Sequence, residues 1–424
     1  MKKIILTLVL LQITLFAQSF LISNIPLPKT YVENLDPYEC DEICLQEYLD
    51  NKMIFSFMAH AHSRLSNKNL EEVRLKNKSL LNIGSNIIES NIRIALLLPY
   101  KIIGKYASST TNSVFAYLMT KSNSFELKTY KIQTQNEDEI DNTLQTIKQD
   151  GFNYVIAPLT KDGAKSVIDI NPDINIYFPT VNKNDVITTS PYLLFGAIDY
   201  KEQSNLLLDK AVSPLIIFSD KSSTGIALAN YQAKVFKTIK SDINNQDDSF
   251  VEERNINTDT KVIKYTLSGR RTNLQRYLKD NEKIQKGSFF INTPIVKTGM
   301  IMSQLTLFDA NATNILSTQI NYNPLLLSMT QYNDRKNMII ANSITQNNKM
   351  LTEANSLLGN DIVYDWINYT TTIGIDYFFS QITNADREYN IPVQDNQMIY
   401  PIKLLKPSYS RFVQYNSNLK QGEY

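Results

Sequence analysis

The sequence predicts an α/β protein with two lobes, each a parallel sheet flanked by helices, after a short N-terminal helical extension. Three observations support this fold class. The chain has 424 residues, more than one compact domain usually holds. From residue 91 onward, short apolar runs typical of buried strands alternate with segments of helical periodicity. Between residues 36 and 80, apolar residues recur at helical spacing instead.

The composition restricts the function. Lys and Arg number 43 and Asp and Glu 42, so the chain lacks the large positive charge of a dedicated nucleic-acid binder. With only two Cys and two His, the chain has few possible ligands for a metalloenzyme site and few candidates for a His-based triad. Gly-rich phosphate loops, Gly-x-Ser-x-Gly elbows and His-Glu-x-x-His pairs do not occur in the sequence. We therefore expect a protein that is not an enzyme and uses no cofactor.

Residues 1–17 are typical of a secretory signal peptide. Lys2 and Lys3 form a positive start, residues 4–16 are apolar, and Ala17 is a small residue suited to cleavage. An N-terminal membrane anchor is the alternative, but the apolar run is shorter than the roughly 20 residues that span a bilayer. We expect a periplasmic protein with no membrane span after cleavage.

Residues 18–90 predict the helical extension. Asp36 can cap a helix, Pro37 suits its first position, and Glu39 completes a capping box. This helix is expected to run to about residue 62, and a second one to follow Asn69. Two amphipathic helices must bury their apolar faces against each other and the main body, or against a partner.

The two Cys and two His lie within 23 residues, at Cys40, Cys44, His60 and His62. In an exported protein a Cys40–Cys44 disulfide is natural, although spacing of four on an ideal helix requires a distorted first turn. A Cys2His2 zinc site is the alternative. The two His are two residues apart, so they would ligate together only if the helix ended there. Free buried Cys with surface His is a third interpretation.

The first lobe is expected at about residues 91–198, with later returns of the chain. Residues 92–98 (IRIALLL) form a nearly continuous apolar run, as in a strand buried on both faces. Further strands are expected at 127–132, 154–157 and 174–178, and helices at about 105–121, 137–149 and after 160. This alternation predicts βαβ units with right-handed crossovers.

The second lobe is expected at about residues 199–345, within a two-lobed body at 91–424. A strand at 194–198 leaves the first lobe, and residues 242–248 are expected to form a polar surface loop. Further strands are expected at 214–219, 288–292, 314–317 and 338–341, and helices at 201–210, 224–240, 273–281 and 296–308. After residue 347 the chain is expected to be helical to 382, with closing strands at 398–404 and 412–415. Two such lobes predict a cleft outside the carboxyl ends of their strands.

Several segments, in order along the chain, resemble type I periplasmic binding proteins. They include RIALLLP (93–99), GFNYVIAPLT (151–160), YFPT (177–180), SPYLLF (190–195), residues 215–236 and LST (316–318). The resemblance covers about residues 91–415. Within this fold, the segment IGID (373–376) on a late helix is similar to the C-terminal domain of the penicillin-binding-protein activator LpoA. That likeness implies an outer-envelope role exerted through protein contacts with peptidoglycan synthases.

The resemblance also implies candidate ligand-binding residues. In amino-acid binders of this fold, loops after the first-lobe strands hold the ligand's carboxylate and amine, and the matching positions are Tyr100, Thr160 and Thr180. Asp220 opens the corresponding loop of the second lobe. Ala157 stands where the family has glycine, and its methyl group limits close backbone approach. Lys161 stands where the family usually has Ser. We therefore expect an altered cleft.

Two functions follow from these observations. The first is a periplasmic scaffold or regulator that contacts a cell-wall synthase or another envelope machine. The second is a solute-binding protein for an amino acid or a similar small polar ligand. A hydrolase is a third class, and no feature of the sequence supports it.

Overall fold

A computed structural model describes residue 32 and residues 40–61, 64–81, 92–121, 123–246, 261–345 and 347–415. The expected signal segment at 1–17 and the expected helix start at Asp36 lie outside these residues. None of the helices in the described part of the chain combines the length and apolar character that crossing a bilayer requires.

The first lobe is built on a seven-stranded sheet. Its strands are β1 (Ile92–Leu98), β2 (Phe125–Lys131), β3 (Tyr154–Ile156), β4 (Asn175–Phe178), β5 (Leu193–Phe195), β11 (Val393–Gln394) and β12 (Gln397–Met398). Their order is β11-β12-β5-β4-β3-β1-β2. All pairs are parallel except β11 with β12. A parallel core of this kind requires crossovers, which the intervening helices supply.

The second lobe repeats this plan with seven strands. They are β6 (Leu215–Ser219), β7 (Val262–Thr266), β8 (Ser288–Asn292), β9 (Asn314–Ser317), β10 (Met338–Asn342), β13 (Lys403–Pro407) and β14 (Phe412–Gln414). The order is β14-β13-β10-β9-β8-β6-β7, and only β13 and β14 run antiparallel to their neighbours. β14 and β7 are therefore the two edge strands of this sheet, and β7 is the one at its parallel end.

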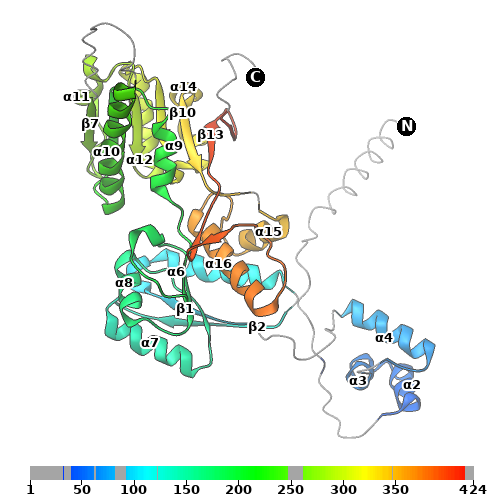
Figure 1. Cartoon of the computed structure of the whole chain (residues 1–424). Helices are drawn as coiled ribbons and strands as arrows, with labels where there is room; N and C mark the ends of the chain where they lie inside the picture. Colours follow the sequence, from blue (N-terminus) through cyan, green and yellow to red (C-terminus); the bar gives the residue numbers. More distant parts are fainter. Residues whose placement is uncertain are drawn as a thin grey trace, which may run out of the picture.

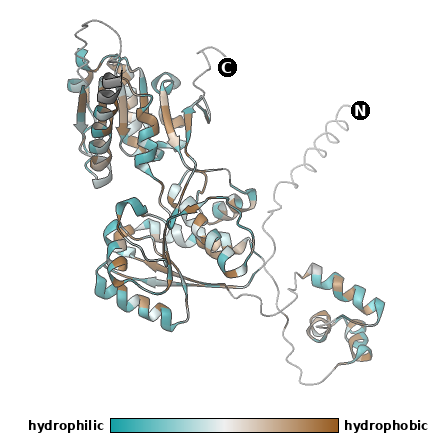
Figure 2. Ribbon diagram, in the orientation of Figure 1, coloured by the Kyte–Doolittle hydropathy of each residue, from teal (hydrophilic) through white to brown (hydrophobic). Residues whose placement is uncertain are grey.

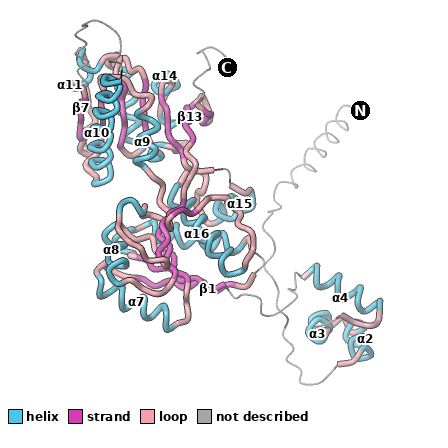
Figure 3. The backbone as a smooth tube through the Cα atoms, in the orientation of Figure 1, coloured by secondary structure: helices cyan, strands magenta, loops and turns pink. Residues whose placement is uncertain are grey.

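Helices cover both faces of each sheet (Figure 3). In the first lobe, α6 (Lys105–Met119), α15 (Lys349–Leu357) and α16 (Trp366–Thr383) share one core, and α7 (Glu137–Gln149) and α8 (Lys161–Ile170) share the other. In the second lobe, α9 (Tyr200–Leu208) and α10 (Ser223–Gln246) cover one face. The opposite face carries α11 (Gln275–Leu278), α12 (Ile295–Leu307), α13 (Leu325–Met329) and α14 (Tyr332–Arg335). The predicted fold class is confirmed.

β1 shows why these sequences form buried strands. Ile94, Leu96 and Leu98 belong to the core on the α6 and α16 side, whereas Ala95 and Leu97 belong to the α7 and α8 side. Successive side chains of a strand point to opposite faces, so a sheet covered on both sides requires an unbroken apolar run. Figure 2 shows the hydrophobic colour recurring along strands of both lobes, and hydrophilic and hydrophobic residues alternating along the helices.

The chain crosses between the lobes three times: from β5 to α9, from β10 to α15, and between β12 and β13 (Figure 1). The sequence predicted one strand at 398–404. The structure corrects this, because β12 ends at Met398 in one sheet and β13 begins at Lys403 in the other. Pro401 lies in the connection, where a missing N–H interrupts no ladder.

Two further expectations were wrong in detail. α10 continues to Gln246, so residues 242–246 are helical rather than part of a loop. Polar composition is as compatible with the solvent-facing end of a long helix as with a loop. The expected single helix ending near residue 62 is two helices, α2 (Glu42–Asp50) and α3 (Ile54–His60). Lys52, between them, has a φ of 59°, which a continuous right-handed helix does not allow.

The N-terminal extension has its own core. α2, α3 and α4 (Lys68–Leu80) contact one another, and they bury Leu45, Phe57, Met58, Ala61 and Leu70 together. Asp41 caps α2 through bonds from the N–H groups of Ile43 and Cys44, at 3.2 and 3.0 Å. The described helices of the extension thus bury apolar side chains against each other, which is one part of the expected packing. The expected contact with the main body, or with a partner, stays a prediction.

Candidate functional site

The predicted ligand-binding residues of the first lobe lie beyond the carboxyl ends of its central strands. Tyr100 begins the short helix α5 (Tyr100–Ile103) directly after β1, Thr160 follows β3, and Thr180 follows β4. Because β1, β3 and β4 are adjacent, their carboxyl ends meet. The Thr180 hydroxyl donates to the Leu159 carbonyl at 2.6 Å, so the β3 and β4 loops are in contact.

Gln135 occupies the donors that a ligand carboxylate would need at Thr160. Its Oε1 accepts a hydrogen bond from the Thr160 backbone N–H at 3.0 Å and another from the Thr160 hydroxyl at 2.9 Å. The carboxamide lies directly over Gly163, in the first turn of α8, where a Cβ would fall 1.7 Å from Oε1. An amide oxygen therefore fills the position at the N-terminus of α8 that the resemblance assigns to a bound carboxylate.

The loop that carries Gln135 is held from two sides. Glu139, in the first turn of α7, accepts the N–H groups of Gln133 and Thr134 through its two carboxylate oxygens, each at 2.8 Å. The bond from the Gln133 N–H, and next that from the Thr134 hydroxyl, hold the pKa of Glu139 below its usual value. The Ser166 hydroxyl donates to the Gln135 carbonyl at 2.9 Å. The side chain of Gln135 is thus presented by a fixed backbone.

The other two predicted residues, Tyr100 and Asp220, have different surroundings. Tyr100 is 57 % exposed, with the Lys131 ammonium 5.5 Å from its ring centre. Asp220, at the carboxyl end of β6 in the second lobe, accepts from the N–H and the hydroxyl of Ser222 at 3.1 and 2.5 Å. Its carboxylate folds back onto its own loop, which is ordinary turn chemistry.

The second lobe ends its central strands in a buried polar layer. The last residues of β6, β8, β9 and β10 are all polar and buried: Ser219, Asn292, Ser317 and Asn342. Asn292 exchanges two hydrogen bonds with Gln232 of α10, at 2.6 and 3.2 Å. Asn342 Oδ1 accepts from the side-chain NH2 group of Gln319, and the side-chain oxygen Oε1 of Gln319 accepts from the Ser343 N–H at 2.6 Å. These side-chain bonds fix the ends of the strands relative to α10 and to the segment around Gln319.

Aromatic side chains join the lobes beside the crossings. Tyr322 of the second lobe lies 5.1 Å from Tyr364 of the first and 4.9 Å from Phe412 of β14, between ring centres. Burial raises the pKa of Tyr322 to about 12. Tyr200 of α9 contacts Trp366 of α16 at 6.1 Å. A small pocket of about 280 Å³ opens beside Tyr322, lined by Tyr322, Ile344, Thr345, Asn347, Thr352 and Val363.

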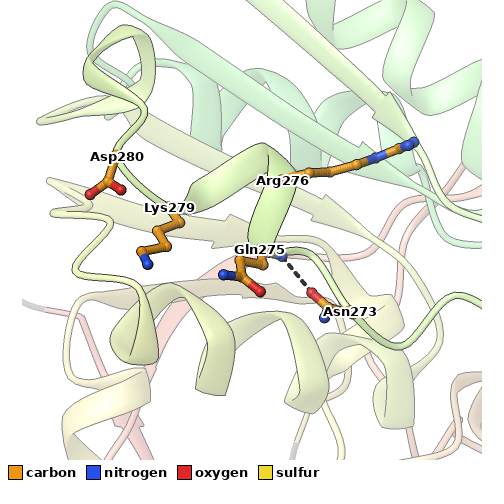
Figure 4. Close-up of a pocket in the computed structure, with 5 residues that line it drawn as sticks. All are labelled: Asn273, Gln275, Arg276, Lys279 and Asp280. Carbon is orange, nitrogen blue, oxygen red and sulfur yellow. Dashed lines mark hydrogen bonds between the residues drawn. The ribbon is translucent and has the colours of Figure 1, made fainter.

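A larger crevice, of about 570 Å³, lies elsewhere on the second lobe. All five residues that line it come from the connection between β7 and β8: Asn273, Gln275, Arg276, Lys279 and Asp280 (Figure 4). It is therefore not formed by the strand ends that the sequence marked as the cleft.

The extension holds the two Cys in a disulfide. Cys40 and Cys44 are bonded, with 5.4 Å between their Cα atoms. Because α2 begins at Glu42, Cys40 precedes the helix, and the distortion expected for a bridge within a helix does not arise. Bonded sulfurs are not thiolate ligands for zinc. His60 stacks on Tyr48, and His62 lies outside the described residues. The described residues contain no group of three or more His, Cys, Asp or Glu suited to a metal ion.

Asp376 has a structural role: its buried carboxylate holds neighbouring elements together and does not line a cleft. It is fully buried on α16 and accepts from the Tyr117 hydroxyl of α6 at 2.9 Å. It also accepts from the backbone N–H groups of Glu388 and Tyr389, at 2.9 and 3.3 Å. The carboxylate therefore ties α6, α16 and the following loop together.

The sequence did not predict the role of Gln135 or the aromatic contacts between the lobes. Gln135 follows β2, an edge strand of the first-lobe sheet, whose loop the resemblance did not mark. Gln135 could have been found by considering the polar residues that lie a few positions after the end of each predicted strand. The pairing of Tyr322 with Tyr364 and Phe412 joins segments far apart in the sequence, and no local pattern indicates it.

Comparisons with known proteins address the fold. No family model and no curated protein matches the sequence. A branched-chain amino acid ABC transporter protein from Rhodospirillum rubrum aligns with a TM-score of 0.56 and 9 % identity, over 77 % of this chain and 100 % of that one. LivJ from Streptococcus pneumoniae, solved with isoleucine, aligns with a TM-score of 0.51 and 9 % identity, over 76 % and 98 %.

LpoA from Haemophilus influenzae aligns with a TM-score of 0.49 and 11 % identity, over 88 % of this chain and 65 % of that one. At such identities a structural likeness establishes the fold and not the activity. The sheet order, the three crossings and the alignments with the Rhodospirillum rubrum protein and LivJ together show that the chain has the two-lobed fold of type I periplasmic binding proteins.

Proposed function

We propose that this chain is a non-enzymatic, exported periplasmic protein that uses its binding-protein fold for contacts with other envelope proteins, as a scaffold or regulator. The signal-like residues 1–17 support export. The separate core of the helical extension supports a module that presents a surface of its own. The expected partner is a cell-wall synthase or another envelope machine.

The observation that carries this proposal is the position of Gln135. The resemblance implies that a free amino acid would place its carboxylate at the N–H and hydroxyl of Thr160. Both donors are bonded to Gln135 Oε1. A ligand would have to displace this amide, which is held by a fixed loop. The arrangement therefore disfavours amino-acid binding at Thr160 and supports a role in protein contacts.

Thermal unfolding in the presence of free amino acids tests this argument. We expect no shift of the melting temperature for the wild-type protein at millimolar concentrations, because a ligand stabilises only in proportion to its occupancy. Gln135→Ala frees the donors of Thr160 and should gain a shift with at least one amino acid. Gln133→Ala, in the same loop without a bond to Thr160, is the matched control. Stabilisation of the wild-type protein by an amino acid would contradict the proposal.

Partner capture tests the positive part of the proposal. The mature protein is cross-linked in envelope extract and its partners are identified by mass spectrometry. We expect a cell-wall synthase or another envelope assembly protein, recovered in a stoichiometric complex that purified components reproduce. Failure to reconstitute any such complex from purified components would count against a scaffold.

Solute binding is the second candidate, because the pocket beside Tyr322 is lined by residues of both lobes. At about 280 Å³ it suits only a small ligand, near the lower end of the usual range of roughly 300–1,000 Å³. Val363→Trp would fill this pocket. Under this alternative, a small polar ligand raises the melting temperature of the wild-type protein and not that of Val363→Trp.

A further inference from the structure

One segment of the second lobe carries a local charge surplus. Residues 261–297 contain nine Lys and Arg and two Asp and Glu, whereas the whole chain has 43 and 42. Seven of these cations are exposed: Lys261, Lys264, Arg270, Arg276, Lys279, Lys283 and Lys286. The segment includes β7, α11 and their connections. The excess positive charge is thus gathered at one edge of one lobe.

These cations lack carboxylate partners within the described chain. No ion pair that the structure shows between described residues includes a Lys or Arg of this segment. The guanidinium carbons of Arg271 and Arg276 lie 5.6 and 4.4 Å from the ring centre of Tyr277. Arg276 also donates to the Tyr277 hydroxyl through Nη2. Stacking on an aromatic ring fixes an Arg while leaving its remaining N–H donors for an anion.

The crevice of about 570 Å³ lies within this segment and combines charged with amide groups. Figure 4 shows Gln275 and Lys279 on one side of α11 and Arg276 reaching out on the other. Asn273 and Gln275 offer amide donors and acceptors of the kind that pair with a peptide backbone. Arg276 and Lys279 offer charge to carboxylates.

The crevice adjoins a free sheet edge. β7 pairs with β6 alone, so its other side has no neighbouring strand among the described residues. Tyr265 of β7 lies 4.7 Å from Tyr277, between ring centres, which places the crevice segment against this strand. Lys297 donates to the carbonyls of Gly269 and Arg271, at 3.0 and 2.6 Å, and so holds the turn after β7 in place.

We propose that β7 and the adjoining basic crevice bind an acidic, extended segment of a partner protein, which adds to the sheet as a further strand. Unpaired N–H and C=O groups of an edge strand supply the backbone hydrogen bonds of such an addition. The surrounding cations select for acidic side chains. This inference rests on the proposed scaffold function and names the chemistry of the partner.

The charge pattern also decides against other occupants. A second copy of this chain would bring the same cations to the same edge, and like charges across strands are destabilising. A flexible polyanion such as polyphosphate would use the cations and leave the edge strand and the amides of Asn273 and Gln275 unused. A peptide segment uses all three features.

Binding of a labelled peptide tests the proposal on the full mature protein. The probe is a fluorescein-labelled peptide of alternating Glu and Val, measured by fluorescence anisotropy. We expect saturable binding that weakens with salt, because exposed charges are screened. Arg276→Glu with Lys279→Glu should weaken it by roughly tenfold or more. Lys349→Glu with Lys403→Glu, an equal charge change at exposed sites elsewhere, should leave binding within about twofold.

Two comparison probes separate strand addition from charge attraction. A Glu-Pro repeat peptide of equal charge cannot join a ladder, because proline lacks the N–H and disfavours a paired strand. We expect it to bind far more weakly. Equal binding of the Glu-Pro peptide, or of polyphosphate of equal charge, would overturn the proposal in favour of a polyanion site.

The 14 residues before Lys261 contain five acids and one Arg. A second form of the protein, with these acids replaced by Asn and Gln, prevents them from competing with the probe. Absence of peptide binding in both forms would overturn the proposal. The scaffold function would still stand if a reconstituted envelope complex survives Arg276→Glu with Lys279→Glu, so the two hypotheses can fail separately.

Discussion

Tyr177 illustrates how single residues determine the packing of the first lobe. Its ring is fully buried, and its hydroxyl donates to the Thr370 carbonyl of α16 at 2.7 Å. A Cβ on Gly196 would fall 1.8 Å from the Tyr177 hydroxyl oxygen, and one on Gly374 would fall 2.0 Å from its ring. The two glycines therefore permit the close approach of α16 and the β5 end to β4.

Gly374→Ala should destabilise the first lobe. The added methyl group meets a buried aromatic ring that cannot rotate away, and overpacking of this kind costs about 1–3 kcal/mol. Urea unfolding followed by far-UV circular dichroism measures the change. Gly269→Ala is the matched control, because no atom lies within 4 Å of its Cβ position. Equal stability of the two variants would contradict the packing argument.

Asp376→Asn should destabilise the protein more than a surface carboxylate substitution does. The amide keeps the size of the side chain, but its NH2 group then faces hydrogen-bond donors from Tyr117, Glu388 and Tyr389. Leaving a buried donor without an acceptor costs about 1–3 kcal/mol. Thermal unfolding measures this, with Asp162→Asn as the control at an exposed ion pair. A loss no larger than that of the control would contradict the fastening role.

The three-helix extension shows how short elements are stabilised. Because its apolar core is small, local hydrogen bonds and ion pairs contribute much of its stability. Glu71 of α4 receives the Arg74 guanidinium through Nε at 2.8 Å and Nη2 at 2.7 Å, and the Leu65 N–H at 3.0 Å. The bonds from Arg74 and then Leu65 lower the pKa of Glu71 from 4.5 to about 2. A single carboxylate thus connects α4 to the turn before it.

The extension should weaken in acid. Because the pKa of Glu71 is lower in the folded state, its stabilisation is fully present above about pH 4.5 and is lost as the pH falls toward about 2. Hydrogen exchange of residues 64–81, measured by mass spectrometry at several pH values and corrected for intrinsic exchange, should show this loss. Glu71→Gln should exchange faster at pH 7 and lose the pH dependence. An unchanged pH dependence in Glu71→Gln would exclude Glu71 as the cause.

At the scale of the whole molecule, two lobes with separate cores are coupled at the crossings. Tyr322 packs against cores of both lobes and lies near Tyr364 and Phe412. The three connecting segments alone would permit hinge motion, as in other folds where a few residues link two domains. The aromatic contacts therefore restrict the relative orientation of the lobes.

Tyr322→Ala should loosen this coupling while each lobe stays folded. We expect a broader distribution of interlobe distances, measured by pulsed electron paramagnetic resonance between one spin label in each lobe. Tyr409→Ala is the control, because Tyr409 stacks on Tyr332 at 4.1 Å within the second lobe. The same distance distribution for both variants would show that the connecting segments set the orientation without Tyr322.

Much of the fold was predictable because its strands are buried on both faces. β1, β8 and β9 have the expected bounds of 92–98, 288–292 and 314–317, because each contains an apolar run that is buried. β7 was not predicted, because an edge strand with an exposed Lys264 lacks that unbroken apolar run. The closing strands were predicted as one segment at 398–404, because a local pattern does not reveal that the chain changes sheet there.

The candidate site was less predictable than the fold. Tyr100, Thr160, Thr180 and Asp220 were named from positions after strands, and the first three do lie at neighbouring strand ends. Their role as ligand contacts stays a prediction. That Gln135 would occupy the donors of Thr160 depends on two loops meeting in space, 25 residues apart in the chain.

By itself the sequence determined the alternation of strands and helices, the two-lobed α/β class and the helical character of the extension. These follow from hydrophobic periodicity, which burial imposes residue by residue. Only the tertiary structure decided which polar groups are already hydrogen-bonded, where the lobes contact each other and which strands form the edges of the sheets. Those features depend on contacts between distant segments, whose energies no local pattern records.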